Sequence, residues 1–258
     1  MRRRVAEMTR LGQKRHLKRL PAPSHWPIRR KEYKFTTRVI PGPHPKEQCM
    51  TLALFLREVL GYAKTMKEVK HILDSGDVLV DSKVRKEPRY PIGIMDVIEI
   101  KSAGERFRVV PSKRYGLRFQ RISEEDAKIK LCQIRGKRMV DGGRVQITLH
   151  DGRNILLPEG ASVSEYRILD TLKISLPDQK ILAHLPLQQG AYAIVSRGTN
   201  TGTEGVIKEM QKRYGTHASM ALVEDKNGHA LGTVLEYVFV IGNKAPDIEI
   251  GTDGGAQY

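Results

Sequence analysis

Residues 65–80 read Thr-Met-Lys-Glu-Val-Lys-His-Ile-Leu-Asp-Ser-Gly-Asp-Val-Leu-Val, and this short run contains a helix, its stop and the start of a strand. Thr65 and Glu68 have the spacing of a capping box, in which each side chain satisfies a backbone N–H at the beginning of a helix. Four apolar residues at helical spacing predict the buried face of that helix: Met66, Val69, Ile72 and Leu73. Gly76 supplies the left-handed residue that ends a helix, and from Val78 the apolar period changes to two, as in a strand.

A second helix is predicted before this one, within residues 47–61. Its apolar face consists of Leu52, Phe55, Leu56, Val59 and Leu60. After the Val78–Val80 strand comes a turn at residues 81–83, and Ile94–Ile100 is predicted as a closing strand. Residues 47–101 are therefore expected to form a small domain of two short helices packed on a small sheet.

The rest of the body is predicted to be mainly β. In residues 102–184, apolar residues alternate with polar ones at Phe107, Val109, Ile129, Leu131, Val145, Ile147 and Leu149. Ser123, followed by three acidic residues, predicts the one helix of this barrel-like segment. In residues 185–242, Asn227–Gly228 predicts a hairpin turn. The predicted fold class is therefore α+β and multidomain.

The charge of the chain is strongly positive and unevenly distributed. Lys and Arg number 45 against 29 Asp and Glu, which leaves a net charge of +16, and residues 1–48 hold 14 of the basic but only 3 of the acidic residues. A basic arm on a nearly balanced body suits an RNA or DNA partner, whose phosphates it neutralises. The longest apolar run, Met50–Leu56, is too short to cross a bilayer, and no signal-peptide pattern follows the N-terminus. We therefore expect a soluble intracellular protein with no membrane partner.

The two ends of the chain differ from the body. Residues 1–46 hold six prolines among basic residues, and we expect this arm to be disordered until it meets RNA. Trp26 is its one large apolar anchor and is predicted to dock on the protein rather than to stack on a base. The arm's candidate RNA contacts are Arg2, Arg3, Arg4, Lys14, Arg15, His16, Lys18, Arg19, Arg29, Arg30 and Lys31. The acidic tail, residues 243–258, is predicted to be loose and not to bind RNA.

No residue pattern indicates a metal, a cofactor or catalysis. Cys49 and Cys132 lack C-x-x-C spacing, so buried reduced thiols are expected. The histidines lack metal-ligand spacing, and no G-x-x-x-x-G-K-[ST] loop is present for nucleotide phosphates. His44 and His150 are interpreted as loop residues that can face RNA. We therefore expect no metal, no cofactor and no small-molecule substrate.

The segment Asp74–Lys83 resembles a known RNA-binding domain. It is similar to the domain named after bacterial small-subunit ribosomal protein four, which also occurs in pseudouridine synthases and tyrosyl-tRNA synthetases. In that family the second helix and the loop after it face RNA, and the matching positions here are Lys64, Lys67, Lys70, Lys83, Arg85 and Lys86. The first three recur every third residue, which would place three ammonium groups on one exposed helix face. A merely solvated face is the alternative.

A second segment, Gln189–Gly198, looks like the KOW motif of ribosomal proteins and transcription elongation factors. Alternating apolar residues predict two strands, and Gly198, Gly202 and Gly205 would let the loop between them approach a phosphate. The residues that would present polar groups in this loop are Arg197, Thr199 and Asn200.

The order of these segments extends the resemblance to most of the chain. Further runs that belong to it are His16–Pro23 with Trp26, Gly42–His44, Tyr90–Ile98 and Tyr237–Gly242. Together they closely resemble the archaeal and eukaryotic small-subunit ribosomal protein family "S-four-e", from about Gln13 to Gly242. The resemblance implies an arm, the helical RNA-binding domain, a central β domain and a KOW barrel of SH3-like kind. It also implies a structural, non-enzymatic role in the cytoplasmic ribosome, with small-subunit ribosomal RNA and neighbouring small-subunit proteins as partners.

Two other functions compete with this one. A pseudouridine synthase would need a catalytic Asp on a large separate domain, and Arg167–Thr171 is only faintly similar to the Arg-Leu-Asp signature. Asp170 is therefore predicted to be a structural turn residue. A KOW-containing transcription factor would leave the arm and the helical domain unexplained.

Overall fold

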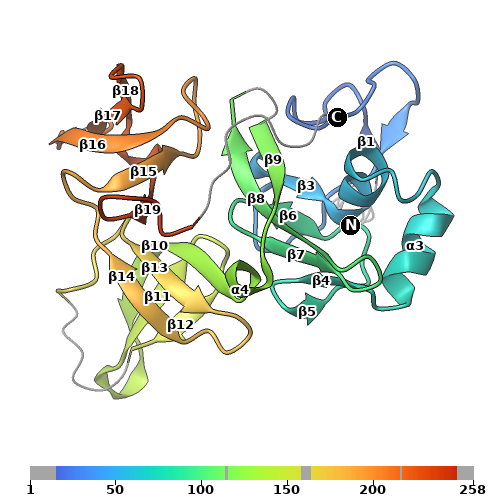
Figure 1. The fold of residues 1–258 in the computed structure, drawn as a ribbon, viewed down its shortest axis with the longest axis horizontal. Coiled ribbons are helices and arrows are strands. Elements are labelled where there is room, and N and C mark those ends of the chain that lie inside the picture. The colour runs from blue at the N-terminus through green and yellow to red at the C-terminus, as the bar shows by residue number, and fades with distance from the viewer. Residues whose placement is uncertain (1–15, 114–115, 158–163, 216, 249–258) are drawn as a thin grey trace, which may run out of the picture.

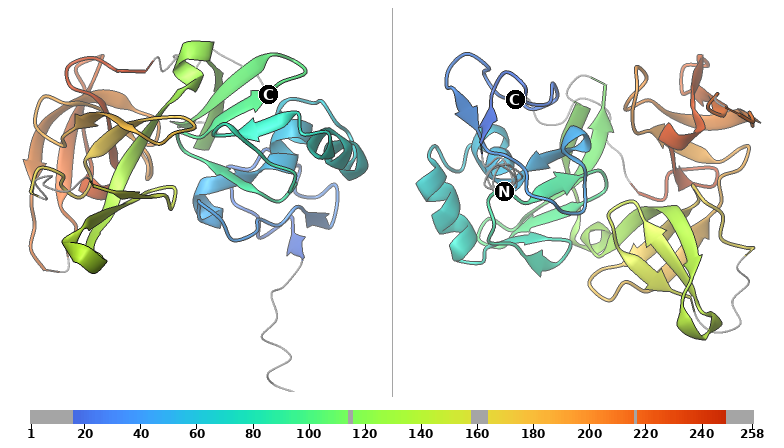
Figure 2. Two further views of the ribbon diagram at one scale, coloured as in Figure 1. Left: turned by 90° about the horizontal axis from the view of Figure 1, so that it is seen from below. Right: turned by 180° about the vertical axis from the view of Figure 1, so that it is seen from behind.

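The computed structural model describes residues 16–113, 116–157, 164–215 and 217–248, which form three five-stranded antiparallel sheets with few helices. The fold is thus mostly β, with less helix than the α+β prediction implied. The first sheet and the arm lie on one side of the molecule and the other two sheets lie on the other side, as Figures 1 and 2 show from three directions.

The first sheet has the strand order β5-β4-β7-β8-β9. Its strands are β4 (Val78–Val80), β5 (Lys83–Val84), β7 (Val97–Ile100), β8 (Glu105–Ser112) and β9 (Gly116–Arg121). The predicted strand from residue 94 starts only at Val97, because Met95 adopts a positive φ of 66° in a turn. The predicted domain limit at residue 101 falls between β7 and β8 of this one sheet.

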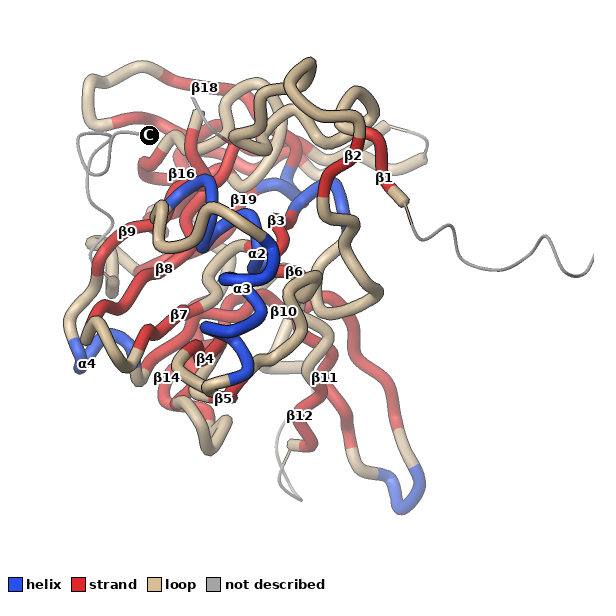
Figure 3. The backbone as a smooth tube through the Cα atoms, turned by 90° about the vertical axis from the view of Figure 1, so that its right-hand side faces the viewer, coloured by secondary structure: helices blue, strands red, loops and turns tan. Residues whose placement is uncertain are grey.

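Helix α3 (Met66–Asp74) begins and ends where the sequence predicts. Thr65 Oγ1 accepts the Glu68 N–H at 3.3 Å and Glu68 Oε2 accepts the Thr65 N–H at 3.4 Å, which completes the capping box. Gly76 follows with a φ of 80°. Figure 3 shows α2 and α3 in front of the strands of the first sheet.

The helix before α3 starts later than predicted. Residues Cys49–Thr51 form strand β3, which pairs with β6 (Pro91–Gly93). Thr51 then caps α2 (Leu52–Leu54), and the chain continues as a π-helix over Phe55–Val59. The apolar face was correctly predicted, but a helical period does not reveal a paired partner some forty residues away.

The second and third sheets follow in sequence. The second has the order β12-β11-β10-β13-β14, and the third has the order β18-β17-β16-β15-β19. The strands are β10 (Ile129–Met139), β11 (Val145–Leu149), β12 (Asn154–Leu156), β13 (Thr171–Ser175), β14 (Ile181–Leu185), β15 (Tyr192–Val195), β16 (Glu204–Gln211), β17 (Met220–Asp225), β18 (Ala230–Val234) and β19 (Val238–Gly242). Ser123 caps α4 (Glu124–Ala127), and Gly228 lies in the turn between β17 and β18, both as predicted.

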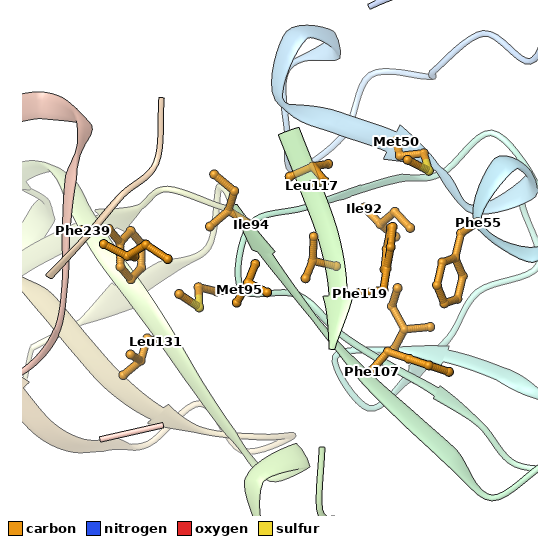
Figure 4. Packing of buried hydrophobic residues seen from close by; sticks show 14 of the residues in the cluster. Met50, Phe55, Ile92, Ile94, Met95, Phe107, Leu117, Phe119, Leu131 and Phe239 are labelled. Carbon is orange, nitrogen blue, oxygen red and sulfur yellow. The ribbon is translucent and has the colours of Figure 1, made fainter. Parts of the chain in front are cut away.

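One large apolar core connects the first sheet with the third. The Phe55 ring lies 4.4 Å from that of Phe119 and 5.6 Å from that of Phe107, measured between centroids. Leu131 and Phe239 extend the same core toward the other two sheets (Figure 4). The sheets are therefore held together by shared apolar packing.

The described part of the arm is folded against the body, which corrects the prediction of disorder for residues 16–46. Trp26 is 3% exposed, and its Nε1 donates to the Cys49 carbonyl at 2.7 Å, so the predicted docking is confirmed. Strands β1 (Leu17–Lys18) and β2 (Phe35–Thr36) pair in a small hairpin. Residues 1–15 lie outside the described residues.

The start of the tail is packed rather than loose. Ile248 is 3% exposed, and Asp247 lies 3.3 Å from the Lys173 ammonium. Residues 249–258 lie outside the described part.

Candidate nucleic-acid interface

The lysines of α3 lie on its solvent face. Lys67 and Lys70 are exposed while the opposite apolar face is buried. Lys64 is also exposed but precedes the cap, so two of the three predicted lysines belong to the helix itself. The Lys64 N–H donates to Glu68 Oε2 at 2.7 Å, and this hydrogen bond is the main cause that lowers the pKa of Glu68.

Strand β5 lies beside the end of α3, as Figure 3 shows. A Cβ built on the glycine that ends α3 would be 3.6 Å from the Val84 side chain. Lys83 and Lys86 are exposed next to it, so the fold gathers the lysines of α3 and of the segment after β4 in one region. We call Lys64, Lys67, Lys70, Lys83 and Lys86 the cationic face. Arg85 is half-buried and stacks over the Tyr90 ring, 4.5 Å from its centroid, so it is partly engaged by the protein.

Arg19, a predicted RNA contact, is instead buried within the arm. Its side chain is 5% exposed and lies 3.6 Å from the Glu32 carboxylate. The guanidinium donates to the Arg29 carbonyl at 2.6 Å and lies over the Tyr33 ring at 4.9 Å. The fold of the arm therefore uses this charge internally.

The other predicted arm residues have different surroundings. Lys18, Arg29 and Lys31 are exposed, as is His16, whose ring lies 5.5 Å from that of Phe35. Arg30 is half-buried and donates to backbone carbonyls between residues 19 and 23. The predicted contacts Arg2, Arg3, Arg4, Lys14 and Arg15 lie outside the described residues.

Two glycines of the second motif, Gly202 and Gly205, are explained by contacts within the protein. A Cβ on Gly202 would lie 2.7 Å from Lys113 N and 2.8 Å from Ser112 Cα. A Cβ on Gly205 would lie 2.0 Å from the Glu224 carbonyl oxygen. Both positions exclude a side chain because another strand or hairpin approaches closely, so the predicted approach of a phosphate does not account for them.

The polar residues of that loop are unequally available. Thr199 is exposed. Asn200 donates through Nδ2 to the Gly232 carbonyl at 3.2 Å. Arg197 is half-buried, with its guanidinium 5.5 Å from the Tyr237 ring centroid.

One exposed cationic loop was missed from the sequence. Lys212 and Arg213 are exposed between β16 and β17, and Tyr214 beside them is 93% exposed. Cations next to an exposed aromatic ring suit contact with RNA phosphates and bases. The signal is a repeat, since Lys-Arg-Tyr-Gly occurs at 113–116 and again at 212–215.

A second group of charges lies inside the protein. Lys130 is fully buried, and its Nζ lies 2.7, 2.7 and 3.0 Å from carboxylate oxygens of Asp81, Asp96 and Asp151. Arg153 lies 2.6 Å from Asp81 and 3.0 Å from Asp151. We call these five residues the buried charge cluster. It connects the first sheet with the second, and no pattern in the sequence indicates it.

The electrostatics of the buried charge cluster favour ionised groups. Burial opposes the charge of Lys130, but Asp81 and Asp96 outweigh it and raise the pKa of Lys130 well above its usual value. Burial likewise favours neutral Asp96, yet His44 and Lys130 hold the pKa of Asp96 far below its usual range. The cluster is therefore a set of mutually dependent ion pairs.

His44 joins the arm to this cluster. Its Nε2 lies 3.0 Å from both carboxylate oxygens of Asp96, and the residue is 6% exposed. A Cβ on Gly93 would lie 2.4 Å from the His44 ring, so the glycine makes room for the histidine. His44 lies in a loop, as predicted, but its side chain faces Asp96 inside the protein and not the solvent.

The second histidine, His150, is also bonded within the protein. Its Nδ1 accepts the Gln133 N–H at 3.2 Å, and its Nε2 donates to the Ile94 carbonyl at 3.1 Å. Desolvation lowers the pKa of His150 to about 4. The ring is therefore neutral near pH 7, with both nitrogens occupied.

Cys132, His150 and Asp151 bring potential metal ligands within 4.8 Å of one another. Their atoms are already engaged, because both nitrogens of His150 are bonded and Asp151 pairs with Lys130 and Arg153. Burial also raises the pKa of the Cys132 thiol well above its usual value. This group belongs to the internal bonding of the protein.

Asp170 has the surroundings of a structural carboxylate. It is 1% exposed, accepts the N–H groups of Arg167 and Leu187 at 2.9 and 2.8 Å, and lies 2.8 Å from His184 Nε2. These contacts close a turn, as predicted. Within the described ranges, no helix is both long and apolar enough to pass through a bilayer.

The mostly β fold carries exposed cations on the cationic face and keeps a second set of charges buried, an arrangement that suits the class of proteins with polyanionic partners. Residues 103–181 match the model of "Ribosomal family S4e", and residues 11–47 match that of the "RS4NT (NUC023) domain". The chain belongs to the S4e family of small-subunit ribosomal proteins. It is a structural ribosomal protein and not an enzyme, which excludes the pseudouridine synthase alternative.

Relatives support this assignment over nearly the whole chain. The small ribosomal subunit protein eS4 of Staphylothermus marinus is 44% identical over 247 residues, covering 94% of this chain and 98% of the relative. That of Methanocaldococcus jannaschii is 40% identical, covering 94% and 100%. The crystal structure of the 30S ribosomal protein S4e from Thermoplasma acidophilum superposes with a TM-score of 0.62 at 32% identity, covering 77% of this chain and 97% of that one.

Proposed function

We propose that this chain binds small-subunit ribosomal RNA through its cationic face and stabilises the assembled subunit in the cytoplasmic ribosome, beside neighbouring small-subunit proteins. Phosphate contacts position such a protein, and their number sets the salt dependence of its affinity.

The observation that carries the proposal is the separation of the two faces of α3. Val69 and Leu73 are fully buried while Lys67 and Lys70 are exposed, and Lys83 and Lys86 lie beside them. Lysines from two separate elements, α3 and the segment after β4, lie in the same region. Solubility alone does not require them to lie together.

The third sheet is our candidate for a KOW domain over residues 185–242. Support comes from the motif at β15 and from five short antiparallel strands in the order β18-β17-β16-β15-β19. The proposed helical domain, predicted as residues 47–101, extends through β9 because β7 and β8 pair in one sheet, and the proposed central domain, predicted as residues 102–184, then begins after Arg121. Thr199 at the tip of the third sheet's loop, and Lys18, Arg29 and Lys31 in the arm, are further proposed contacts, since all four are exposed.

The test measures the affinity of the full chain for small-subunit ribosomal RNA across a salt series. Engaging about 6 phosphates gives a log–log slope of about −4 to −5. Replacing Lys64, Lys67 and Lys70 by Glu should weaken binding and flatten this slope.

The matched control reverses Lys128, Lys180 and Lys226, which are exposed elsewhere. It changes the net charge equally and should weaken binding much less. Equal losses in both triple variants would show that total charge, and not the cationic face, determines binding. A slope near zero for the wild type would reject the proposed function itself.

A further inference from the structure

We infer that Arg135 and Arg197 form a binding site for a single phosphate group, in the crevice where the three sheets and the arm meet. The inference rests on the proposed function in taking the RNA backbone as the source of that phosphate. Arg135 was not among the residues that the sequence singled out.

Two arginines converge on one cavity. Arg135 and Arg197 both line a cavity of about 190 Å³ between the second and third sheets, together with His44 and His150. This volume is several times that of a water molecule, which leaves room for a phosphate group. Among the described residues that line the cavity there is no Asp or Glu.

The backbone directs Arg135 to this place. The register of β10 and β11 shifts between Ile134 and Gly136, so Arg135 is the extra residue of a β-bulge. Bulges re-aim side chains and are common beside functional sites. Arg197 is positioned from the opposite side, because Ser196 holds the chain with two hydrogen bonds to the Tyr237 carbonyl at 2.7 and 2.8 Å.

Neither guanidinium has an anionic partner at bonding distance within the described residues. Arg197 Nε is buried without a hydrogen bond, and its guanidinium only stacks on Tyr237. Burial, and then the charge of Arg197, lower the pKa of Arg135, while Glu236 acts weakly in the other direction. Two partly desolvated cations that repel each other are stabilised when an anion binds between them, and guanidinium groups match phosphate oxygens in geometry.

A second cavity connects the site with the motif loop. Its volume is about 360 Å³, and Arg197 and Ser196 line both cavities, while Gly198 and Thr201 line the second. Glu47 contributes a carboxylate to the second cavity but not to the first. The anion therefore belongs at the Arg135 end of the crevice.

The experiment compares Arg135→Gln and Arg197→Gln in the full chain with the control Arg138→Gln. Arg138 lies three residues further along β10 and is exposed. The control substitution therefore removes one positive charge from the same strand without changing the cavity. The first measurement is the melting temperature in sodium phosphate against sodium chloride at equal ionic strength and pH. Phosphate should raise it in the wild type and in the control, and the rise should be lost in the two site variants. In chloride alone, Arg135→Gln should melt no lower than the control, because a repulsion has been removed.

The second measurement is the salt dependence of ribosomal RNA binding. In each site variant, the slope of log affinity against log salt should become shallower by about 0.7 to 0.9 than in the Arg138→Gln control. This difference corresponds to the loss of one phosphate contact. A phosphate-dependent rise in melting temperature with unchanged RNA slopes assigns the site to free phosphate instead of RNA. If the site variants and the control show the same melting temperatures and the same salt slopes, the proposed phosphate site is rejected, even where the wild type binds RNA as proposed. Failure of the wild type to bind RNA contradicts the proposed function separately.

Discussion

The cationic face and the buried charge cluster contain the same kind of side chain in opposite surroundings. Lys67 is exposed on α3, whereas Lys130 has no exposed side-chain surface and contacts three carboxylates within 3.0 Å. The first can attract a partner at little cost to the fold, because surface charges contribute little to stability. The second is already committed to holding two sheets together. A count of basic residues therefore overstates the charge that is available to RNA.

The strongest test of this difference removes Lys130. Lys130→Met should lower the free energy of unfolding by about 3 to 5 kcal/mol, because it leaves buried carboxylates without their main counter-charge. Urea unfolding measures this, with Lys128→Met as the exposed control, for which we expect a change within about 0.5 kcal/mol. Similar small losses in both variants would show that Arg153 alone balances the carboxylates.

A pH series tests whether the interior near the cluster resists further positive charge. Burial lowers the pKa of His150 from 6.5 to about 4, so the unfolded chain takes up a proton first. Stability should therefore fall as pH falls from about 6.5 to about 4, by up to about 1.4 kcal/mol per pH unit.

The His150→Gln variant should lose less stability over the same window, measured as urea midpoints. A weak dependence of its stability on pH should remain, since burial also lowers the pKa of His25. Exposed His71→Gln is the control and should follow the wild type. A His150→Gln variant with the full wild-type slope would place the titration elsewhere.

On the exposed side, the stability of α3 should depend on its cap and not on its lysines. Thr65→Ala removes an acceptor for the Glu68 N–H and should cost about 1 kcal/mol. Urea unfolding detects this, and Thr65→Ser, which keeps the hydroxyl, should stay near the wild type. An undiminished stability in Thr65→Ala would mean that packing alone determines where α3 begins.

The exposed lysines of α3 should contribute least to stability. Lys67→Glu with Lys70→Glu should change the free energy of unfolding by no more than about 0.5 kcal/mol while it weakens RNA binding. A large loss of stability would mean that these lysines serve the fold, as Lys130 does.

The parts of the fold that the sequence predicts correctly are set by neighbouring residues. The capping box at Thr65, the cap at Ser123, the turn at Gly228 and the docking of Trp26 each follow from residue type and local spacing. The exposure of the α3 lysines is predictable in the same way, since the helical period of the sequence places them opposite the apolar face.

The missed features depend on partners far along the chain. In the sequence, Lys130 cannot be distinguished from a surface lysine. Its partners Asp81 and Asp96 lie 49 and 34 residues earlier and meet it only in the fold. The internal positions of Arg19 and His44 are hidden for the same reason, because neither the β1–β2 hairpin nor the space above Gly93 can be deduced from local pattern. The order of the described arm likewise comes from its docking on the body and not from a core of its own.

The buried charge cluster also has a consequence for synthesis. Asp81 and Asp96 are synthesised before Lys130 and Arg153, and domains generally fold from the N-terminus as they appear. Until β10 and the segment after β11 have been made, Asp96 has only His44 as its partner, and Asp81 lacks both Lys130 and Arg153. The nascent first half should therefore remain hydrated and loosely closed along that edge, and arrival of the second sheet neutralises and shuts it. We therefore expect closure of the two halves to wait for Lys130 and Arg153, the last cations of the cluster to be synthesised.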